Sequence, residues 1–185
     1  KLNALKGRYR GLALEDEMVA YLPHCTFNLN PRAASIDTPL HAYIARKHVD
    51  HMHPDAVIAI AACANSKALT QKIFEGELGW LPWQRPGYDL GLKLEAVSQA
   101  QPNLKGIILE GHGLFTWGDT AKSCYEVTLA IIKRAEDWLA AHTKQPAFGG
   151  AKVSPLPSEE RAALVQRLMP LLRGKISQDE YKLGH

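Results

Sequence analysis

Apolar residues recur along this chain with two periods, one typical of helices and one typical of strands. Helical spacing predicts helices over 15–21, 38–47, 54–64, 66–74 and 89–100, and from Asp119 or Thr120 to about residue 141. Short apolar runs predict strands over 49–53, 105–110 and 114–117, the last two as a hairpin, and a strand or ordered loop over 80–83. Because helices alternate with short strands, we expect a layered α/β sandwich.

The pattern changes after residue 145. A stretch with proline and glycine over 146–150 predicts a linker, Ser158 is a predicted cap for a small helix over 159–172, and the residues from 174 onward are polar. We therefore expect one domain over 1–145, followed by a linker, small helix and polar tail over 146–185. The chain starts at Lys1 without an initiator methionine, which indicates a fragment or a processed chain.

Composition narrows the class of protein. With 185 residues, 46% of them hydrophobic, the chain is long enough for one globular core. The net charge of +3 comes from dispersed basic residues, so we expect no nucleic acid partner. No apolar run approaches the roughly 20 residues that span a bilayer, and no secretory signal precedes the domain, so we expect no membrane partner. Three cysteines without a Cys-x-x-Cys pair indicate reduced thiols in a cytoplasmic protein.

The most informative motif is a pair of histidines at the end of a predicted strand. His51 and His53 are two residues apart, and alternate strand residues share a face, so both imidazoles can point the same way. His112 follows a later apolar run and lies between two glycines, which allow close approach of the backbone. Three histidines with an open position are typical of a catalytic metal site. The alternative is that, among 8 histidines, the pair lies by chance on the surface or at a helix N-cap.

Three further residues near these motifs are candidates for chemistry. Asp37 stands at a predicted helix start and is either an acid/base group or a cap of that helix. His41 lies one turn later on the same face, where it either orients the Asp37 carboxylate or is a satisfied core histidine. Glu110 directly precedes Gly111 and is either a group that orients a metal ligand or a charge at a strand end.

Several other catalytic motifs are absent from the sequence. There is no Gly-x-Gly-x-x-Gly dinucleotide fingerprint, no phosphate-binding P-loop and no Gly-x-Ser-x-Gly nucleophile elbow. No lysine lies in a setting that marks a Schiff-base nucleophile. Metal-assisted chemistry is therefore the simplest enzymatic interpretation.

Taken in order, these motifs resemble those of the class II aldolase/adducin family across about residues 18–142. The similar segments are Ser35-Ile36-Asp37-Thr38-Pro39-Leu40-His41, His51-Met52-His53-Pro54, Leu81-Pro82-Trp83 and Glu110-Gly111-His112-Gly113-Leu114. Within the family, the residues in these segments are most similar to those of the rhamnulose-1-phosphate aldolase module of bifunctional aldolase/lactaldehyde dehydrogenase proteins. The resemblance implies a three-layer α/β/α sandwich around a mainly antiparallel or mixed sheet.

The resemblance also implies a role for each candidate residue. Zinc, or another divalent metal, would be held by His51, His53 and His112 and would act as a Lewis acid. The implied reaction is retro-aldol cleavage of a small phosphorylated ketose, in this branch L-rhamnulose 1-phosphate, to dihydroxyacetone phosphate and L-lactaldehyde. Asp37 stands where family members place a catalytic glutamate, and its side chain is one methylene shorter. The family also implies a homotetramer.

Two functional alternatives share this fold. A sugar-phosphate epimerase or dehydratase would have a similar metal site, whereas an adducin-like assembly module would keep the fold without catalysis. Retention of all three histidines argues against the assembly module. The family binds substrate phosphate with glycine-rich loops upstream of the first motif, and no such loop precedes Asp37 here. We therefore expect a domain that is incomplete at its N-terminus and holds the substrate phosphate weakly.

Overall fold

The computed structural model describes residues 1–27, 34–144 and 149–177. The chain forms two compact units, Lys1–Lys144 and Gln145–His185, and each is described by itself. The helices of the first unit are α1 (Leu2–Leu5), α2 (Asp16–Tyr21), α3 (Thr38–Tyr43), α4 (Asp55–Ala61), α5 (Ser66–Phe74), α6 (Tyr88–Ala100) and α7 (Ala121–His142). Its strands are β1 (His48–Met52), β2 (Leu78–Leu81), β3 (Gly106–Leu109) and β4 (Gly113–Gly118).

The four strands form one mixed sheet in the order β1-β4-β3-β2. β1 pairs antiparallel with β4, so that His51 lies opposite Phe115. β3 and β4 form the predicted antiparallel hairpin. β2 and β3 are parallel, because α6 carries the chain from the end of one strand to the start of the other.

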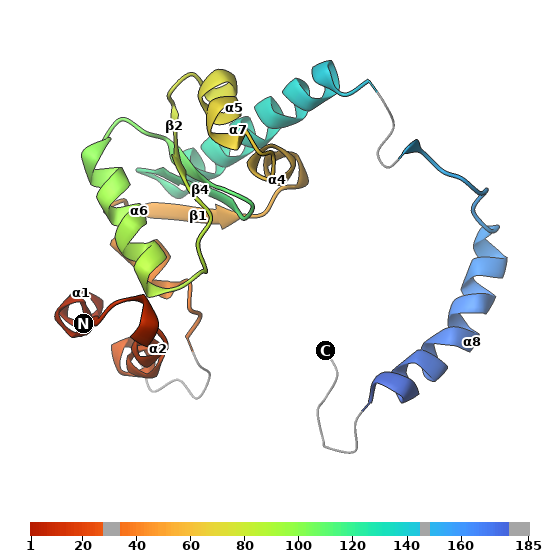
Figure 1. Cartoon of the computed structure of the whole chain (residues 1–185), viewed down its shortest axis with the longest axis horizontal. Coiled ribbons are helices and arrows are strands. Elements are labelled where there is room, and N and C mark those ends of the chain that lie inside the picture. The colour runs from red at the N-terminus through yellow and green to blue at the C-terminus, as the bar shows by residue number, and fades with distance from the viewer. Residues whose placement is uncertain (28–33, 145–148, 178–185) are drawn as a thin grey trace. The chain divides into compact units, whose positions relative to one another are not determined.

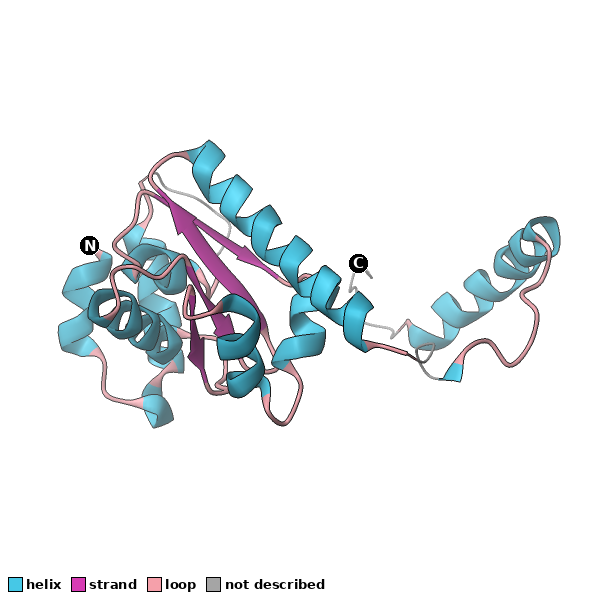
Figure 2. Cartoon of the chain, turned by 90° about the horizontal axis from the view of Figure 1, so that it is seen from above, coloured by secondary structure: helices cyan, strands magenta, loops and turns pink. Residues whose placement is uncertain are grey.

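Helices cover both faces of this sheet (Figures 1 and 2). α3 and α6 contribute Leu40 and Leu94 to a buried core on one face, which also contains Ile107 of β3. α4, α5 and α7 pack on the other face around a second core, which contains the next strand residue, Ile108. This alternation of side chains is the period-2 pattern of a strand buried on both faces. The structure confirms the expected α/β/α sandwich around a mixed sheet.

Buried polar contacts attach the N-terminal helices to this sandwich. The hydroxyls of Tyr43 and Tyr88 lie 2.6 Å apart in a third cluster that includes residues of α1 and α2. Glu15 is only 5% exposed, and its Oε1 accepts a hydrogen bond from the Asp89 N–H at 2.8 Å. A carboxylate at the first turn of α6 satisfies a free backbone N–H and suits the positive end of the helix dipole.

Several predicted boundaries differ in the structure, among them those of α3, β1 and β2. α3 ends at Tyr43 instead of residue 47, because Ile44 adopts an extended conformation and enters the core. β1 ends at Met52, which leaves His53 just beyond the strand. β2 begins two residues earlier than the predicted 80–83 and ends at Leu81, because the buried core takes the side chain of Leu78 while Trp83 stays 64% exposed.

α7 starts with the predicted cap. The Thr120 side chain accepts a hydrogen bond from the Ser123 N–H, and the Ser123 side chain accepts one from the Thr120 N–H. This capping box satisfies two backbone groups that the helix itself leaves free. Ile131 and Ala135 of α7 are buried, whereas Ala130 is exposed because the buried face of the helix turns away from it.

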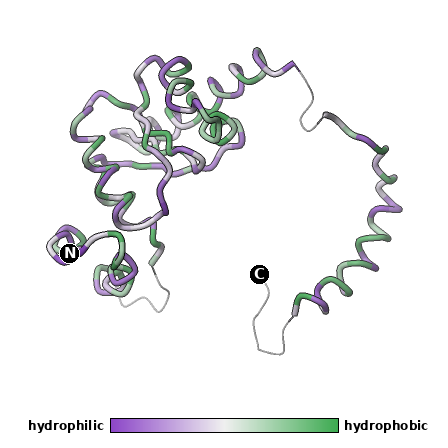
Figure 3. The backbone as a smooth tube through the Cα atoms, viewed as in Figure 1, coloured by the Kyte–Doolittle hydropathy of each residue, from purple (hydrophilic) through white to green (hydrophobic). Residues whose placement is uncertain are grey.

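The second unit contains α8 (Ser158–Ile176), which is longer than the predicted helix over 159–172. The predicted Ser158 cap is wrong: Pro157 precedes the helix, no side chain caps it, and Ser158 is its first residue. Hydrophobic and hydrophilic residues follow one another closely along α8 (Figure 3). Most of the predicted linker and the tail beyond residue 177 lie outside the described residues. Within the described residues, no helix has the length and apolar character needed to cross a membrane.

Candidate metal centre

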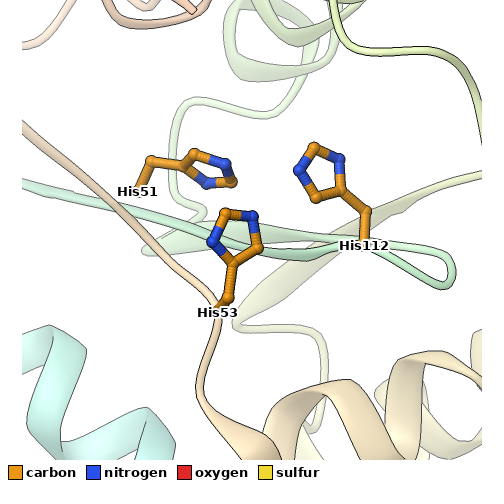
Figure 4. A group of neighbouring side chains, drawn as sticks. All are labelled: His51, His53 and His112. Atoms are coloured by element: carbon orange, nitrogen blue, oxygen red, sulfur yellow. The ribbon is translucent and has the colours of Figure 1, made fainter. Parts of the chain in front are cut away.

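Three histidines surround one shared space near the end of β1 (Figure 4). His51 lies in β1, His53 follows that strand, and His112 lies in the turn between β3 and β4. The His51 ring centroid is 4.5 Å from that of His53 and 5.1 Å from that of His112, and the other two centroids are 5.0 Å apart. One ring nitrogen from each residue lies within 4.8 Å of the other two. The structure therefore brings together the three histidines that the sequence singled out.

The β1–β4 pair fixes the orientation of the His51 ring. The ring stacks on Phe115 with a centroid distance of 4.1 Å and an interplanar angle of 6°. Its Nδ1 lies 3.1 Å from the Leu114 carbonyl oxygen, an acceptor that assigns the ring proton to Nδ1. The remaining nitrogen, Nε2, is buried and has no hydrogen-bond partner among the residues that the structure describes. A buried nitrogen lone pair without a donor is unfavourable unless a cation occupies its direction, so this atom fits a metal ligand.

Burial favours the neutral form of the His51 and His112 imidazoles, which is the form that binds metals. Burial lowers the pKa of His51 to about 4, although the hydrogen bond to Leu114 acts in the opposite direction. Burial also lowers the pKa of His112, and the neighbouring His53 adds to that effect. A donor set of three imidazoles is one that zinc accepts in catalytic sites with an open position.

The low pKa of His51 predicts a loss of stability of the metal-free protein in mild acid. Its pKa is about 4 in the folded chain and 6.5 without the fold, so between these values only the unfolded chain binds the proton. The free energy of unfolding should therefore fall as pH drops from about 6.5 towards 4. Urea denaturation of the wild type and of His51→Asn at several pH values measures the difference. Parallel pH profiles for the two proteins would contradict the prediction.

Gly113 provides the space in which His53 lies. A Cβ atom at this position would come within 2.7 Å of the Met52 carbonyl oxygen and 2.8 Å of His53 Cδ2. Both distances are shorter than real Cβ contacts, so the β1 end or the His53 ring would have to move.

We expect Gly113→Ala to displace His53 and lower metal affinity by about 10- to 100-fold, the range found when groups that orient a ligand are lost. Isothermal titration with Zn²⁺ measures this. Gly7→Ala is the control, because a Cβ there meets nothing within 4 Å. Equal affinity for the wild type and Gly113→Ala would show that His53 is not held by this contact.

An open pocket beside the triad contains Asp37. It is lined by residues from the start of α3 and the end of β1, namely Ser35, Asp37, Thr38, His41, Ala42, His51 and His53. The Asp37 side chain does not cap α3, and the Ser35 Oγ accepts a hydrogen bond from the Asp37 N–H at 3.1 Å. Burial dominates the pKa of both His51 and His112, and the Asp37 carboxylate acts in the opposite direction on each. The carboxylate is therefore close to the triad and is not used by the helix.

The two other predicted groups contact the backbone around the site. The His41 Nδ1 lies 3.2 Å from the Val49 carbonyl oxygen of β1, and its ring meets that of Phe115 edge-on. The Glu110 Oε2 accepts a hydrogen bond from the Trp83 N–H at 2.8 Å, which holds the segment after β2. Among the hydrogen bonds of the described residues, neither side chain bonds to a triad ring.

Sequence reasoning missed the residues that orient His51. Phe115 stacks on its ring, and the Leu114 carbonyl oxygen contacts its Nδ1. In the sequence these residues belong to an ordinary apolar strand, so no local signal separates them from core residues. Their role follows only from the pairing of β1 with β4.

Comparison with known proteins identifies a family and a relative to which this chain is similar. The chain matches the family described as Class II Aldolase and Adducin N-terminal domain over residues 9–139. It is 37% identical over 167 residues to "Uncharacterized oxidoreductase YuxG" of Bacillus subtilis (strain 168), and the match covers 90% of this chain and 24% of that protein. The chain thus spans about a quarter of the length of this curated relative.

Two solved structures are also similar. The N-terminal class II aldolase domain of a conserved protein from Thermoplasma acidophilum has a TM-score of 0.66 and 31% identity, covering 75% of this chain and 64% of that chain. A sugar-phosphate aldolase from Thermotoga maritima has a TM-score of 0.50 and 18% identity, covering 60% of this chain and 56% of that chain. The second likeness is one of fold alone.

Proposed function

The chain belongs to the class II aldolase and adducin family, and on that premise we propose that it is a metal-dependent aldehyde-lyase that performs retro-aldol cleavage of a phosphorylated ketose. The substrate we propose is L-rhamnulose 1-phosphate, which would give dihydroxyacetone phosphate and L-lactaldehyde. The observation that carries the proposal is the buried, unpartnered Nε2 of His51 within a triad of imidazoles, next to the pocket that contains Asp37.

His51, His53 and His112 are the residues that would hold the metal, and zinc is the first choice for three imidazoles. A bound divalent ion supplies Lewis-acid stabilisation of negative charge on substrate oxygens. The chain's own contribution is orientation: the Leu114 carbonyl and the Phe115 ring keep the His51 Nε2 directed at the shared space. Burial keeps the ring neutral and therefore able to act as a ligand.

Asp37 is the group that we propose to move the proton. Cleavage breaks the C3–C4 bond of the ketose while the C4 hydroxyl loses its proton and C4 becomes the aldehyde carbon. The Asp37 carboxylate takes that proton, because it lines the pocket and is free of a capping role. The C3 carbon of the other fragment then takes up one proton, which completes dihydroxyacetone phosphate.

The name of the Bacillus subtilis relative raises an oxidoreductase as another candidate. That protein is about four times as long as the match, and 24% of it corresponds to this chain. The sequence has no Gly-x-Gly-x-x-Gly fingerprint, with which many nicotinamide-dependent enzymes bind the pyrophosphate. We therefore assign lyase chemistry, and not hydride transfer, to this domain. An epimerase or dehydratase with the same triad remains the second proposal.

The direct test is incubation of the zinc-loaded protein with L-rhamnulose 1-phosphate. We expect L-lactaldehyde and dihydroxyacetone phosphate in equal amounts, and no product after treatment with a chelator. Formation of an epimeric sugar phosphate without aldehyde would favour an epimerase, and loss of water would favour a dehydratase. A protein that forms none of these products and binds no metal would favour an adducin-like assembly module. Sedimentation of the same sample tests the predicted homotetramer.

A further inference from the structure

A partly buried hydrogen-bond network holds β1 to α7 on the face of the sheet opposite the triad. The Thr128 hydroxyl donates to the Asp50 Oδ2 at 2.9 Å, and the Oγ1 atoms of Thr128 and Thr116 lie 2.6 Å apart. Thr116 is 0% exposed and Thr128 is 3% exposed. A hydroxyl has one proton, and the Thr128 hydroxyl has two acceptors in reach, the Asp50 Oδ2 and, at 3.0 Å, the Cys124 carbonyl oxygen. Because an ionised carboxylate is the stronger acceptor, we assign Thr128 as the donor to Asp50 and Thr116 as the donor to Thr128. These three residues are called the Asp50 network.

The register of β1 links this network to the triad. Asp50 lies opposite Thr116, and the next residue, His51, lies opposite Phe115. Because neighbouring strand residues point to opposite faces, Asp50 faces α7 while His51 faces the metal centre. A shift of one residue in the pairing would exchange these faces, so a bond that fixes Asp50 also fixes the direction of His51.

β1 lies at the edge of the sheet, so its side-chain contacts matter for its position. It pairs with β4 alone in the described sheet, and none of its five residues is fully buried. A hydrogen bond to an ionised carboxylate is stronger than one between neutral groups, so loss of the Thr128 hydroxyl should weaken the attachment of Asp50 to α7. The Cys124 thiol of α7 also hydrogen-bonds to Asp50, and burial, followed by this hydrogen bond, raises the pKa of Cys124 to about 11.

We propose that the Asp50 network is a positioning device for the metal centre, which fixes β1 so that His51 and His53 hold the geometry needed for a divalent cation. Asp50, Thr116 and Thr128 act through the strand and do not touch the metal or the substrate. The proposal rests on the proposed function in one respect, that the triad binds a divalent ion.

The experiment is titration with Co²⁺, whose visible absorption reports both occupancy and coordination geometry. Thr128→Val removes the hydroxyl at nearly constant volume, and we expect about 10- to 100-fold weaker Co²⁺ binding with an altered spectrum. Thr128→Ser keeps the hydroxyl and should restore affinity and spectrum. Ile131→Val in α7 is the matched control, since it loosens the packing of the same helix one turn away without removing a network hydrogen bond. It should leave Co²⁺ binding unchanged. Asp50→Asn removes the charge and should also weaken binding.

The results distinguish the role of the Asp50 network from the existence of the metal centre. Weak binding by Thr128→Val and Asp50→Asn, with normal binding by Thr128→Ser and Ile131→Val, would support the proposal. Wild-type affinity and spectrum in Thr128→Val would overturn the positioning role of the Asp50 network and leave the proposed metal centre intact. Equal losses in Thr128→Val and Ile131→Val would also overturn it, because general loosening of α7 would then suffice. A wild-type protein that binds no Co²⁺ would overturn the proposed metal centre together with this inference.

Discussion

Replacement of His53 by alanine should abolish equimolar binding of a divalent metal and with it the cleavage of a phosphorylated ketose. His53 contributes one of the three nitrogens that lie within 4.8 Å of one another, and its loss would leave two ligands. Loss of a group that merely orients a ligand costs about 10- to 100-fold in affinity, so loss of a ligand should cost more than about 100-fold. Metal content after dialysis and calorimetric titration with Zn²⁺ measure the effect.

His53→Ala is the preferred variant because this side chain is exposed, so its removal leaves no cavity in the core. His51→Ala should lose metal in the same way, although it also removes the stack against Phe115. His48→Ala is the matched control, because His48 is an exposed histidine at the other end of the same strand and lies outside the triad. Equimolar metal in dialysed His53→Ala would show that the triad is not the binding site.

Substitution of Asp37 by asparagine should lower turnover by about 10²- to 10⁴-fold, the usual contribution of a general acid or base. The amide keeps the size of the side chain but can no longer take a proton from the substrate. Metal binding should persist, because the three histidines are unchanged. The free energy of unfolding should also stay the same, since the Asp37 side chain makes no capping hydrogen bond to α3.

Initial rates with saturating substrate and urea denaturation of the same preparations measure the two effects. Asp119→Asn is the control, because Asp119 is an exposed acid just before α7 and is not part of the pocket. Unchanged turnover together with lower stability in Asp37→Asn would favour a structural role for this carboxylate. A loss of metal in the same variant would instead indicate that Asp37 acts as a ligand.

The sequence by itself was sufficient to predict most of the helices and strands and the candidate metal ligands. Period-2 and period-3.6 patterns depend on neighbouring residues, so they predict most of the strands and helices and a layered α/β sandwich. The spacing of His51 and His53 is also a pattern of neighbouring residues, and the glycines beside His112 indicate a turn. Boundaries that depend on burial were displaced, as at Ile44, which leaves the predicted helix because the core accepts its side chain.

Only the tertiary structure decided how these residues are held. The contact of His51 with the Leu114 carbonyl joins positions 63 residues apart, and that of Asp50 with Thr128 joins positions 78 residues apart. Both contacts require the β1–β4 register, in which a shift of one residue would turn every side chain to the other face. Packing of two cores against opposite faces of the sheet selects that register. The free energy that favours this register comes from packing of the assembled layers and not from any short segment. Local sequence patterns therefore cannot predict the register.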